Sequence, residues 1–228
     1  TRPLEFGTVH LQMYISDFHK LRDTLCINNM WNDQWIKYHY VGKLTYVTTN
    51  YRYYLAIIKV FPSAENDFDP QDDELYPKRY TVHFITSRGI MDEFRTHVGL
   101  SHLAESSRYC SYDKNRFGNE LTFIIPNWIN TNCPNKEQEE LSVASIEWST
   151  AMLDAEASYM NLIKMGCTAQ EAREVLPLAV KSELISCGFE DIWKNFFYRR
   201  CAKDAHPMAR EIATKVRDKF KELGYVNQ

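Results

Sequence analysis

The chain has 228 residues, of which 44% are hydrophobic and 14% aromatic, and it carries a formal net charge of -3. This composition predicts a folded protein with a sizeable core and excludes a disordered chain. The near balance of charge argues against a general nucleic-acid-binding protein. Because no apolar run approaches roughly 20 residues, we expect no membrane span.

Six cysteines lie at positions 26, 110, 133, 167, 187 and 201. No pair has C-x-x-C spacing and none joins a Cys/His cluster typical of zinc, so no metal site is predicted. A disulfide framework stays open but is unnecessary at this length. We favour free thiols in a reducing cytoplasm, a location that fits the lack of a signal-peptide pattern near the first residue.

The first half of the chain is predicted to be rich in strands. Alternating and β-branched residues predict a strand near Glu5–Ile15. The pattern from Asp17 to Tyr54 is ambiguous, with a short helix ending around Phe61. The acidic, proline-containing segment over 63–78 is predicted to be an exposed loop.

Three further elements are predicted before the middle of the chain. The segment "RYTVHFIT" at 79–86 has the pattern of a second strand. A helix follows over 87–99, with Ser87 as its N-cap. "NELTFIIPNWI" at 119–129 is predicted to be a third strand or extended segment, stopped by Pro126.

From Leu141 onward the pattern is predominantly helical. Four helices are predicted, over residues 142–166, 168–188, 189–202 and 206–224. Gly166 suits a C-cap, and Thr168 with Glu171 forms a capping box. Pro177 predicts a kink in the second helix. We therefore expect a single α+β domain over 1–228, with a strand-rich N-terminal half and a helical C-terminal half.

A short polar stretch within "FRTHVGLSHLAESSRYCSY" is the first candidate site. Ser106 and Ser107 stand beside Arg108, and hydroxyls next to an arginine are able to hold a phosphate. A polar turn with a surface arginine explains the same residues. From the residues alone, both interpretations stay open.

Other candidates have equally ordinary explanations. His97 lies in a predicted helix without a nucleophile–base pair nearby, so a catalytic triad is unsupported. Arg173 either lines a cavity shaped by the predicted kink or pairs on the surface with Glu174 or Glu171. Arg210 lies in the first turns of the last helix, where acidic residues are more usual, which hints at an anionic partner.

Several segments together resemble the flavin-dependent thymidylate synthases. The signature of that family is R-H-R, then seven residues and a serine, continuing into S-x-R-Y. "SRGIMDEFRTHVGLSHLAESSRYCSY" aligns with this region without a gap from Ser87 to Tyr112. "DKNRFGNELTFIIPNW", "AREVLPLAVKSEL" and "FFYRRCAKDAHPMAREIA" resemble later family segments in the same order.

The resemblance implies the fold and the chemistry of these enzymes. They methylate dUMP at C5 with carbon from methylenetetrahydrofolate, using FAD that NADPH reduces. The reduced flavin supplies the redox chemistry, and the protein binds and orients. The resemblance also implies a homotetramer whose active sites combine residues of several subunits.

Site residues follow from the same resemblance. The nucleotide dUMP is expected at Glu93, Ser106, Ser107, Arg108, Arg173 and Arg210. The flavin is expected at Thr96, His97, Val98 and Arg200. Arg210, which would polarise the uracil ring, and Ser106 are the predicted catalytic residues.

Two departures from the signature open an alternative. Thr96 and Val98 replace its arginines, so R-H-R becomes T-H-V. Each lost charged hydrogen bond costs roughly 1.5–3 kcal/mol. Arg95 cannot replace them directly, because successive helical residues point about 100° apart; His102 and Arg88 are other candidates. The alternatives are a divergent paralogue that binds a pyrimidine nucleotide but is inactive or acts on another pyrimidine, and an oligomeric scaffold.

Overall fold

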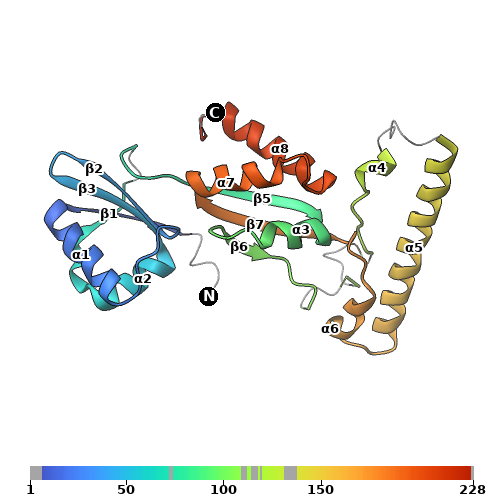
Figure 1. Ribbon diagram of the computed structural model, residues 1–228. Helices are drawn as coiled ribbons and strands as arrows, with labels where there is room; N and C mark the ends of the chain where they lie inside the picture. The colour runs from blue at the N-terminus through green and yellow to red at the C-terminus, as the bar shows by residue number, and fades with distance from the viewer. Residues whose placement is uncertain are drawn as a thin grey trace.

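The computed structural model describes residues 7–71, 74–108, 112–113, 118, 120–130 and 138–226. These residues form an α+β structure with two separate antiparallel sheets (Figure 1). The predicted fold class is therefore confirmed. Each sheet has its own hydrophobic cluster, and a third cluster lies beneath a long helix.

The first sheet has the strand order β2-β3-β1-β4. Its strands are β1 (Thr8–Tyr14), β2 (Ile36–Val41), β3 (Leu44–Asn50) and β4 (Phe68–Asp69). Three helical elements accompany it: α1 (Ile15–Ile27), α2 (Tyr51–Val60) and the 3₁₀ turn η2 (Pro62–Asp67). Leu11, Phe18, Val47 and Ile57 are fully buried in its cluster. The strand predicted near Glu5–Ile15 and the helix ending at Phe61 are confirmed.

The second sheet positions the candidate site. Its order is β5-β7-β6, with β5 (Arg79–Ser87), β6 (Ser101–Ala104) and β7 (Lys181–Phe189). The central strand β7 pairs with β5 over nine residues, from Arg79↔Phe189 to Ser87↔Lys181. Helices α3 (Arg88–Arg95), α7 (Glu190–Arg200) and α8 (Pro207–Glu222) pack on this sheet and on one another (Figure 1).

Aromatic rings dominate the core between these helices and the second sheet. Trp193, Phe196 and Phe94 are completely buried, and Leu184 meets them from the central strand. The indole Nε1–H of Trp193 donates to the Tyr80 carbonyl at 3.0 Å. This core fixes α3 and α7 against the sheet, so the residues that these helices carry have fixed positions.

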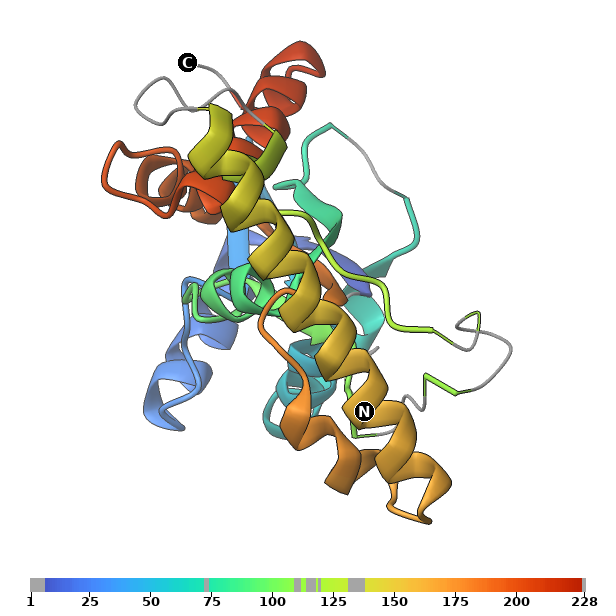
Figure 2. The same ribbon diagram turned by 90° about the vertical axis from the view of Figure 1, so that its right-hand side faces the viewer.

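A long helix stands beside the second sheet. It is α5 (Gln138–Lys164), preceded by α4 (Asn127–Asn130) and followed by α6 (Ala169–Ala172) and the 3₁₀ turn η4 (Arg173–Val175) (Figures 1 and 2). Tyr159 in its last turns is fully buried against the third cluster. In the part of the chain that the structure describes, no helix has the length and hydropathy needed to cross a bilayer.

Three predicted elements are wrong in whole or in part. The exposed loop expected over 63–78 contains most of η2 and all of β4, and its Ala64 and Tyr76 are buried. The helix expected over 168–188 stops after α6 and η4, and the rest is β7. Pro177 ends the helix instead of kinking it, and pairing with β5 and β6 overrides the helix-forming residues beyond it. The strand expected over 119–129 is reduced to one bridge, Phe123↔Val180, followed by α4. The helices expected over 142–166, 189–202 and 206–224 are confirmed as α5, α7 and α8.

Candidate functional site

The first turn of α3 organises the candidate site. Ser87 is its N-cap, and its hydroxyl accepts from the Ile90 N–H at 3.4 Å, as the sequence predicts. The next amides donate across to the chain that enters β7: Arg88 to the Val180 carbonyl at 2.9 Å and Gly89 to the Leu178 carbonyl at 3.1 Å. These bonds tie α3 to the 178–180 segment. A cavity opens on each side of this junction.

The first cavity, which we call the basic cavity, has a volume of about 300 Å³. Arg88 and Asp92 line it from one face of α3, since residues four apart share a helix face. Ser107 lines it from the segment after β6, and Arg173 lines it from η4. Lys181 contributes from the start of β7. Two residues predicted to bind dUMP, Ser107 and Arg173, therefore meet in one cavity.

Each cation of the basic cavity has one carboxylate neighbour. Arg88 Nε lies 3.1 Å from Asp92 Oδ2, and Arg173 Nε lies 3.3 Å from Glu174 Oε1. Lys181 Nζ lies 2.5 Å from Glu183 Oε1, and this bond is the main cause that lowers the pKa of Glu183. The surface pairing of Arg173 with Glu174 that the sequence suggested is thus present, and it coexists with a place in the cavity.

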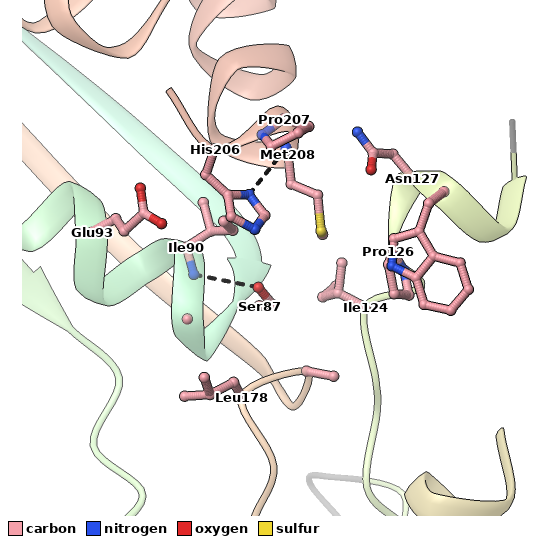
Figure 3. Close-up of a pocket in the computed structure, with 13 residues that line it drawn as sticks. Ser87, Ile90, Glu93, Ile124, Pro126, Asn127, Leu178, His206, Pro207 and Met208 are labelled. Atoms are coloured by element: carbon pink, nitrogen blue, oxygen red, sulfur yellow. Dashed lines mark hydrogen bonds between the residues drawn. The ribbon is translucent and has the colours of Figure 1, made fainter. Parts of the chain in front are cut away.

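The second cavity, which we call the apolar cavity, has a volume of about 470 Å³. Figure 3 shows Ile90 and Glu93 of α3 on one side and Ile124 and Pro126 on the other. His206, Pro207 and Met208, at the start of α8, form a third wall, and Leu178 lies below. Leu178 lines both cavities. The second space therefore combines mostly apolar walls with the Glu93 carboxylate and the His206 imidazole.

Glu93 belongs to a cluster that joins α3 to the end of α7. Arg200 Nη2 donates to the Glu93 carbonyl at 2.6 Å and to Thr96 Oγ1 at 3.3 Å, and its Nη1 lies 3.4 Å from Glu93 Oε2. The Thr96 hydroxyl also donates to the Glu93 carbonyl, at 2.7 Å. Three predicted ligand contacts, Glu93, Thr96 and Arg200, are thus brought together although Arg200 is more than 100 residues away in sequence.

His97 lies at the inner edge of this cluster. It is 6% exposed, and its ring packs edge-on against Phe196 with centroids 5.3 Å apart. Burial, with further contributions from the charge of Arg200 and from His102, lowers the pKa of His97 from 6.5 to about 4. The imidazole is therefore neutral at pH 7.

Two buried nitrogens of the cluster have no hydrogen-bond partner among the described residues: His97 Nε2 and Arg200 Nε. Buried polar atoms in native proteins are normally bonded, so an unpaired pair of this kind points to a missing ligand. Arg200 Nε–H requires an acceptor, and the ring carbonyls and phosphates of a flavin nucleotide are acceptors. His97 and Arg200 therefore fit the expected cofactor, whereas the side chain of Val98, which is 71% exposed, offers it no hydrogen bond.

The remaining predicted residues lie apart from both cavities. Arg108 is exposed, and its Nε donates to Gln170 Oε1 of α6 at 2.9 Å. Arg210 Nη1 donates to the Lys203 carbonyl at 2.7 Å. Ser106 is half-buried and lines neither cavity. Of the three arginines Arg108, Arg173 and Arg210, only Arg173 lines one of these two cavities.

Sequence reasoning missed some residues of the two cavities. Lys181 was hidden inside the helix predicted over 168–188, and His206 preceded the last helix without a motif around it. Arg88 was considered as a possible replacement for the missing arginines, without a location. Among the described residues, no group of three or more His, Cys, Asp or Glu side chains is arranged to hold a metal ion.

A family model described as "Thymidylate synthase complementing protein" matches residues 78–223. That range covers more than half of the chain, including the second sheet, its helices and both cavities. The chain belongs to this family. The first sheet, over residues 8–69, lies outside the matched range.

Curated relatives carry a more specific name. The chain is 30% identical over 130 residues to the flavin-dependent thymidylate synthase of Pyrococcus furiosus, covering 57% of this chain and 49% of that protein. It is 29% identical over 130 residues to the flavin-dependent thymidylate synthase of Pyrococcus abyssi, with the same coverage. The chain thus spans about half the length of the curated relatives it matches.

Proposed function

We propose that this protein is a flavin-dependent thymidylate synthase that methylates dUMP at C5, with methylenetetrahydrofolate as carbon donor and NADPH as reductant of FAD. The observation that carries the proposal is the cluster of Glu93, Thr96, His97 and Arg200, with two buried nitrogens that await a partner. Family membership over residues 78–223 supports it.

The two cavities suggest how the ligands divide. The basic cavity holds the phosphate end of dUMP at Ser107 and Arg173, and the neighbouring Ser106 and Arg108 complete that end. Glu93, which lines the apolar cavity, contacts the nucleotide from the α3 side. Thr96, His97, Val98 and Arg200 border the flavin, which supplies the reducing equivalents when bound. Arg210 acts on the uracil ring, and because it lies outside both cavities we assign that contact to a neighbouring subunit.

Self-association is part of the proposal. Val143, Ile146 and Leu153 of α5 are 63–64% exposed and stand three and seven residues apart, on one face of the helix. An exposed apolar stripe of this kind usually marks a protein interface. A homotetramer that covers it would also bring arginines of different subunits to one site. We also propose that residues 1–228 form a single domain and that the protein works in a reducing cytoplasm. Cys26, Cys167, Cys187 and Cys201 are unpaired, which is consistent with that location.

An absorbance spectrum near 450 nm and a dUMP titration test the proposal directly. The purified protein should be yellow or bind added FAD, and it should oxidise NADPH faster when dUMP is present. Arg108→Ala should weaken dUMP binding by about 10- to 100-fold, because a charge-assisted hydrogen bond contributes roughly 1.5–3 kcal/mol. Lys164→Ala, at the exposed end of α5, is the matched control. Unchanged dUMP affinity in Arg108→Ala would contradict its assignment to the phosphate.

A divergent paralogue is the second candidate, and position 98 favours it. Val98 presents an exposed apolar side chain where the family signature has an arginine, and Thr96 uses its hydroxyl within the α3–α7 cluster. Such a paralogue binds dUMP or a related pyrimidine nucleotide but forms no dTMP. Product analysis after incubation with all co-substrates separates the two: nucleotide binding without dTMP selects the paralogue, and binding of neither dUMP nor FAD leaves an oligomeric scaffold.

A further inference from the structure

We propose that Arg88 and Lys181 complete a phosphate-binding site with Arg173 and Ser107, so that the basic cavity takes the dianion of a phosphate monoester. The inference rests on the proposed function, and it adds two binding residues that the signature motifs do not contain. The charge and the volume of the basic cavity indicate which end of the nucleotide it binds, namely the phosphate end.

The three cations are neither fully solvated nor fully buried. The exposed side-chain fractions of Arg88, Arg173 and Lys181 are 28%, 33% and 30%. Partial burial strengthens the attraction of each cation for an anion in the cavity while leaving the site open to entry. Because the three come from α3, η4 and β7, the cavity surrounds its occupant with charge from three elements.

Both guanidinium groups are held by one edge and free at the other. Arg88 and Arg173 each bind a carboxylate through Nε, and their outer nitrogens have no other partner in the part of the chain that the structure describes. This arrangement fixes the plane of each group and leaves a fork of N–H donors for two phosphate oxygens. Lys181 adds a point charge, and the Ser107 hydroxyl adds a neutral donor.

The carboxylates nearby do not cancel this charge. Asp92 is shared by two arginines, because Arg95 Nη2 also approaches its Oδ1 at 3.1 Å. The charged side chains that line the cavity are thus Arg88, Arg173 and Lys181 against Asp92 and Glu174. One positive charge is left over before an anion binds, and a phosphate monoester carries close to two negative charges at pH 7.

Backbone amides do not provide an alternative site at this point. The first N–H groups of α3 are already bonded to Val180, Leu178 and Ser87. Side chains must therefore supply the recognition. A volume of about 300 Å³ is at the lower end for a ligand site, which suits a phosphate and its sugar better than a whole nucleotide.

The experiment measures the affinity of the full chain for dUMP and for deoxyuridine, which lacks the phosphate, by calorimetry. Arg88→Gln and Lys181→Met should each weaken dUMP binding by about 10- to 100-fold and leave the affinity for deoxyuridine unchanged. Arg95→Gln is the matched control, since it lies on the same helix and shares Asp92 but does not line the cavity. It should change dUMP affinity by less than about threefold. Arg88→Lys, which keeps the charge and loses the fork, should give an intermediate loss.

Three results separate the inference from the proposed function. Loss of the preference for dUMP over deoxyuridine in Arg88→Gln, with thermal stability retained, supports the site. Wild-type dUMP affinity in a folded Arg88→Gln overturns the inference while FAD and dUMP binding by the parent protein still support the proposed function. A parent protein that binds neither FAD nor dUMP overturns both.

Discussion

The two sheets of this protein differ in how completely they satisfy their own buried polar atoms. In the first sheet, Thr45 Oγ1 is the one buried side-chain oxygen or nitrogen without a hydrogen-bond partner among the described residues. In the second region, such atoms belong to Thr86, His97, Glu105 and Arg200, whereas Asp92 Oδ1 has only its ion pair with Arg95. Unpaired buried groups are costly, and those of His97 and Arg200 lie together at the ends of α3 and α7, in the candidate site.

The sheets also differ in how far apart in sequence their strands lie. The central strands of the first sheet, β1 and β3, pair within the segment 8–50. The second sheet pairs β5 with β7 about a hundred residues later, as in Phe84↔Leu184. Closing such a long segment is what brings Arg200 to Glu93 and Lys181 to Arg88. The long-range sheet is therefore the one that carries the candidate site.

Truncating a large, fully buried aromatic side chain in each sheet region should give the largest effect. Trp193→Ala removes a fully buried indole and leaves the Tyr80 carbonyl without its donor, and Phe18→Ala removes the corresponding aromatic group from the first cluster. We expect each change to lower the free energy of unfolding by about 3–5 kcal/mol. Differential scanning calorimetry checks whether both variants shift one common transition, as a single domain requires. Two separate transitions, each sensitive to one variant, would contradict the single domain.

Protonation of His97 should distinguish the second region at acidic pH. Its pKa is about 4 in the folded protein and 6.5 in the unfolded chain, so the unfolded chain binds the extra proton between these values. Stability conferred by the neutral ring is present above pH 6.5 and is lost as the pH falls toward 4, by at most about 3 kcal/mol. Urea denaturation of His97→Gln should show a shallower acid slope than the parent. Equal slopes would show that another group, such as His102, is responsible.

Loss of the α6 capping box should have a moderate effect confined to the site region. The Thr168 N–H donates to Glu171 Oε2 at 2.8 Å, and Thr168 Oγ1 accepts from the Glu171 N–H at 3.4 Å. Thr168→Ala should cost about 0.5–2 kcal/mol of stability. Because α6 carries Gln170 and leads into Arg173, dUMP affinity should fall as well. Chemical denaturation and calorimetry measure the two effects; a stability loss without any change in affinity would separate α6 from the site.

The smallest effect is expected at a contact between the two regions. Lys37 Nζ of β2 lies 2.7 Å from Asp191 Oδ2 of α7. Exposed ion pairs contribute about 0.2–1 kcal/mol and weaken with salt, so Lys37→Met should lower stability slightly at low ionic strength and not at high ionic strength. Lys20→Met, which breaks a pair with Asp17 inside α1, is the control. A loss of stability well above about 1 kcal/mol in Lys37→Met, without a similar loss in Lys20→Met, would contradict the assignment of Lys37–Asp191 as a weak surface contact between the two regions.

Some elements could be predicted because the pattern was local. Strand β1 has β-branched and alternating residues and alternates in burial from Leu11 to Tyr14, and α3 begins after a serine that caps it. Strand β7 was mistaken for a helix because "LAVKSEL" contains good helix formers, and its strand conformation depends on partners far away in sequence. Strand β6 has four residues, too few for a periodic signal. The strand conformation of β7 and β6 is therefore determined by their pairing within the second sheet and not by the intrinsic propensities of their residues.

The sequence predicted which residues belong to the candidate site, but not how these residues are arranged in space. Resemblance to a family named Glu93, His97 and Arg200, and the structure brings them together through α3 and α7. Arg88 and Lys181 lie in segments that resemble the family but outside its R-H-R and S-x-R-Y signature, and their shared cavity depends on the pairing of Ser87 with Lys181 across β5 and β7. Such a neighbourhood cannot be read from a sequence in which the two residues are 93 positions apart.

Helix α5 projects well past the cluster that anchors it. Since an α-helix rises 1.5 Å per residue, Val143 stands about 24 Å along the axis from the buried Tyr159. In a dimer with a twofold axis, a projecting helix of this kind would contact the partner, and the same helix of the partner would make the same contact in return, so each contact would occur twice. A single substitution on that arm would count double in an assembled pair, while folding of the separate chain would hardly register it.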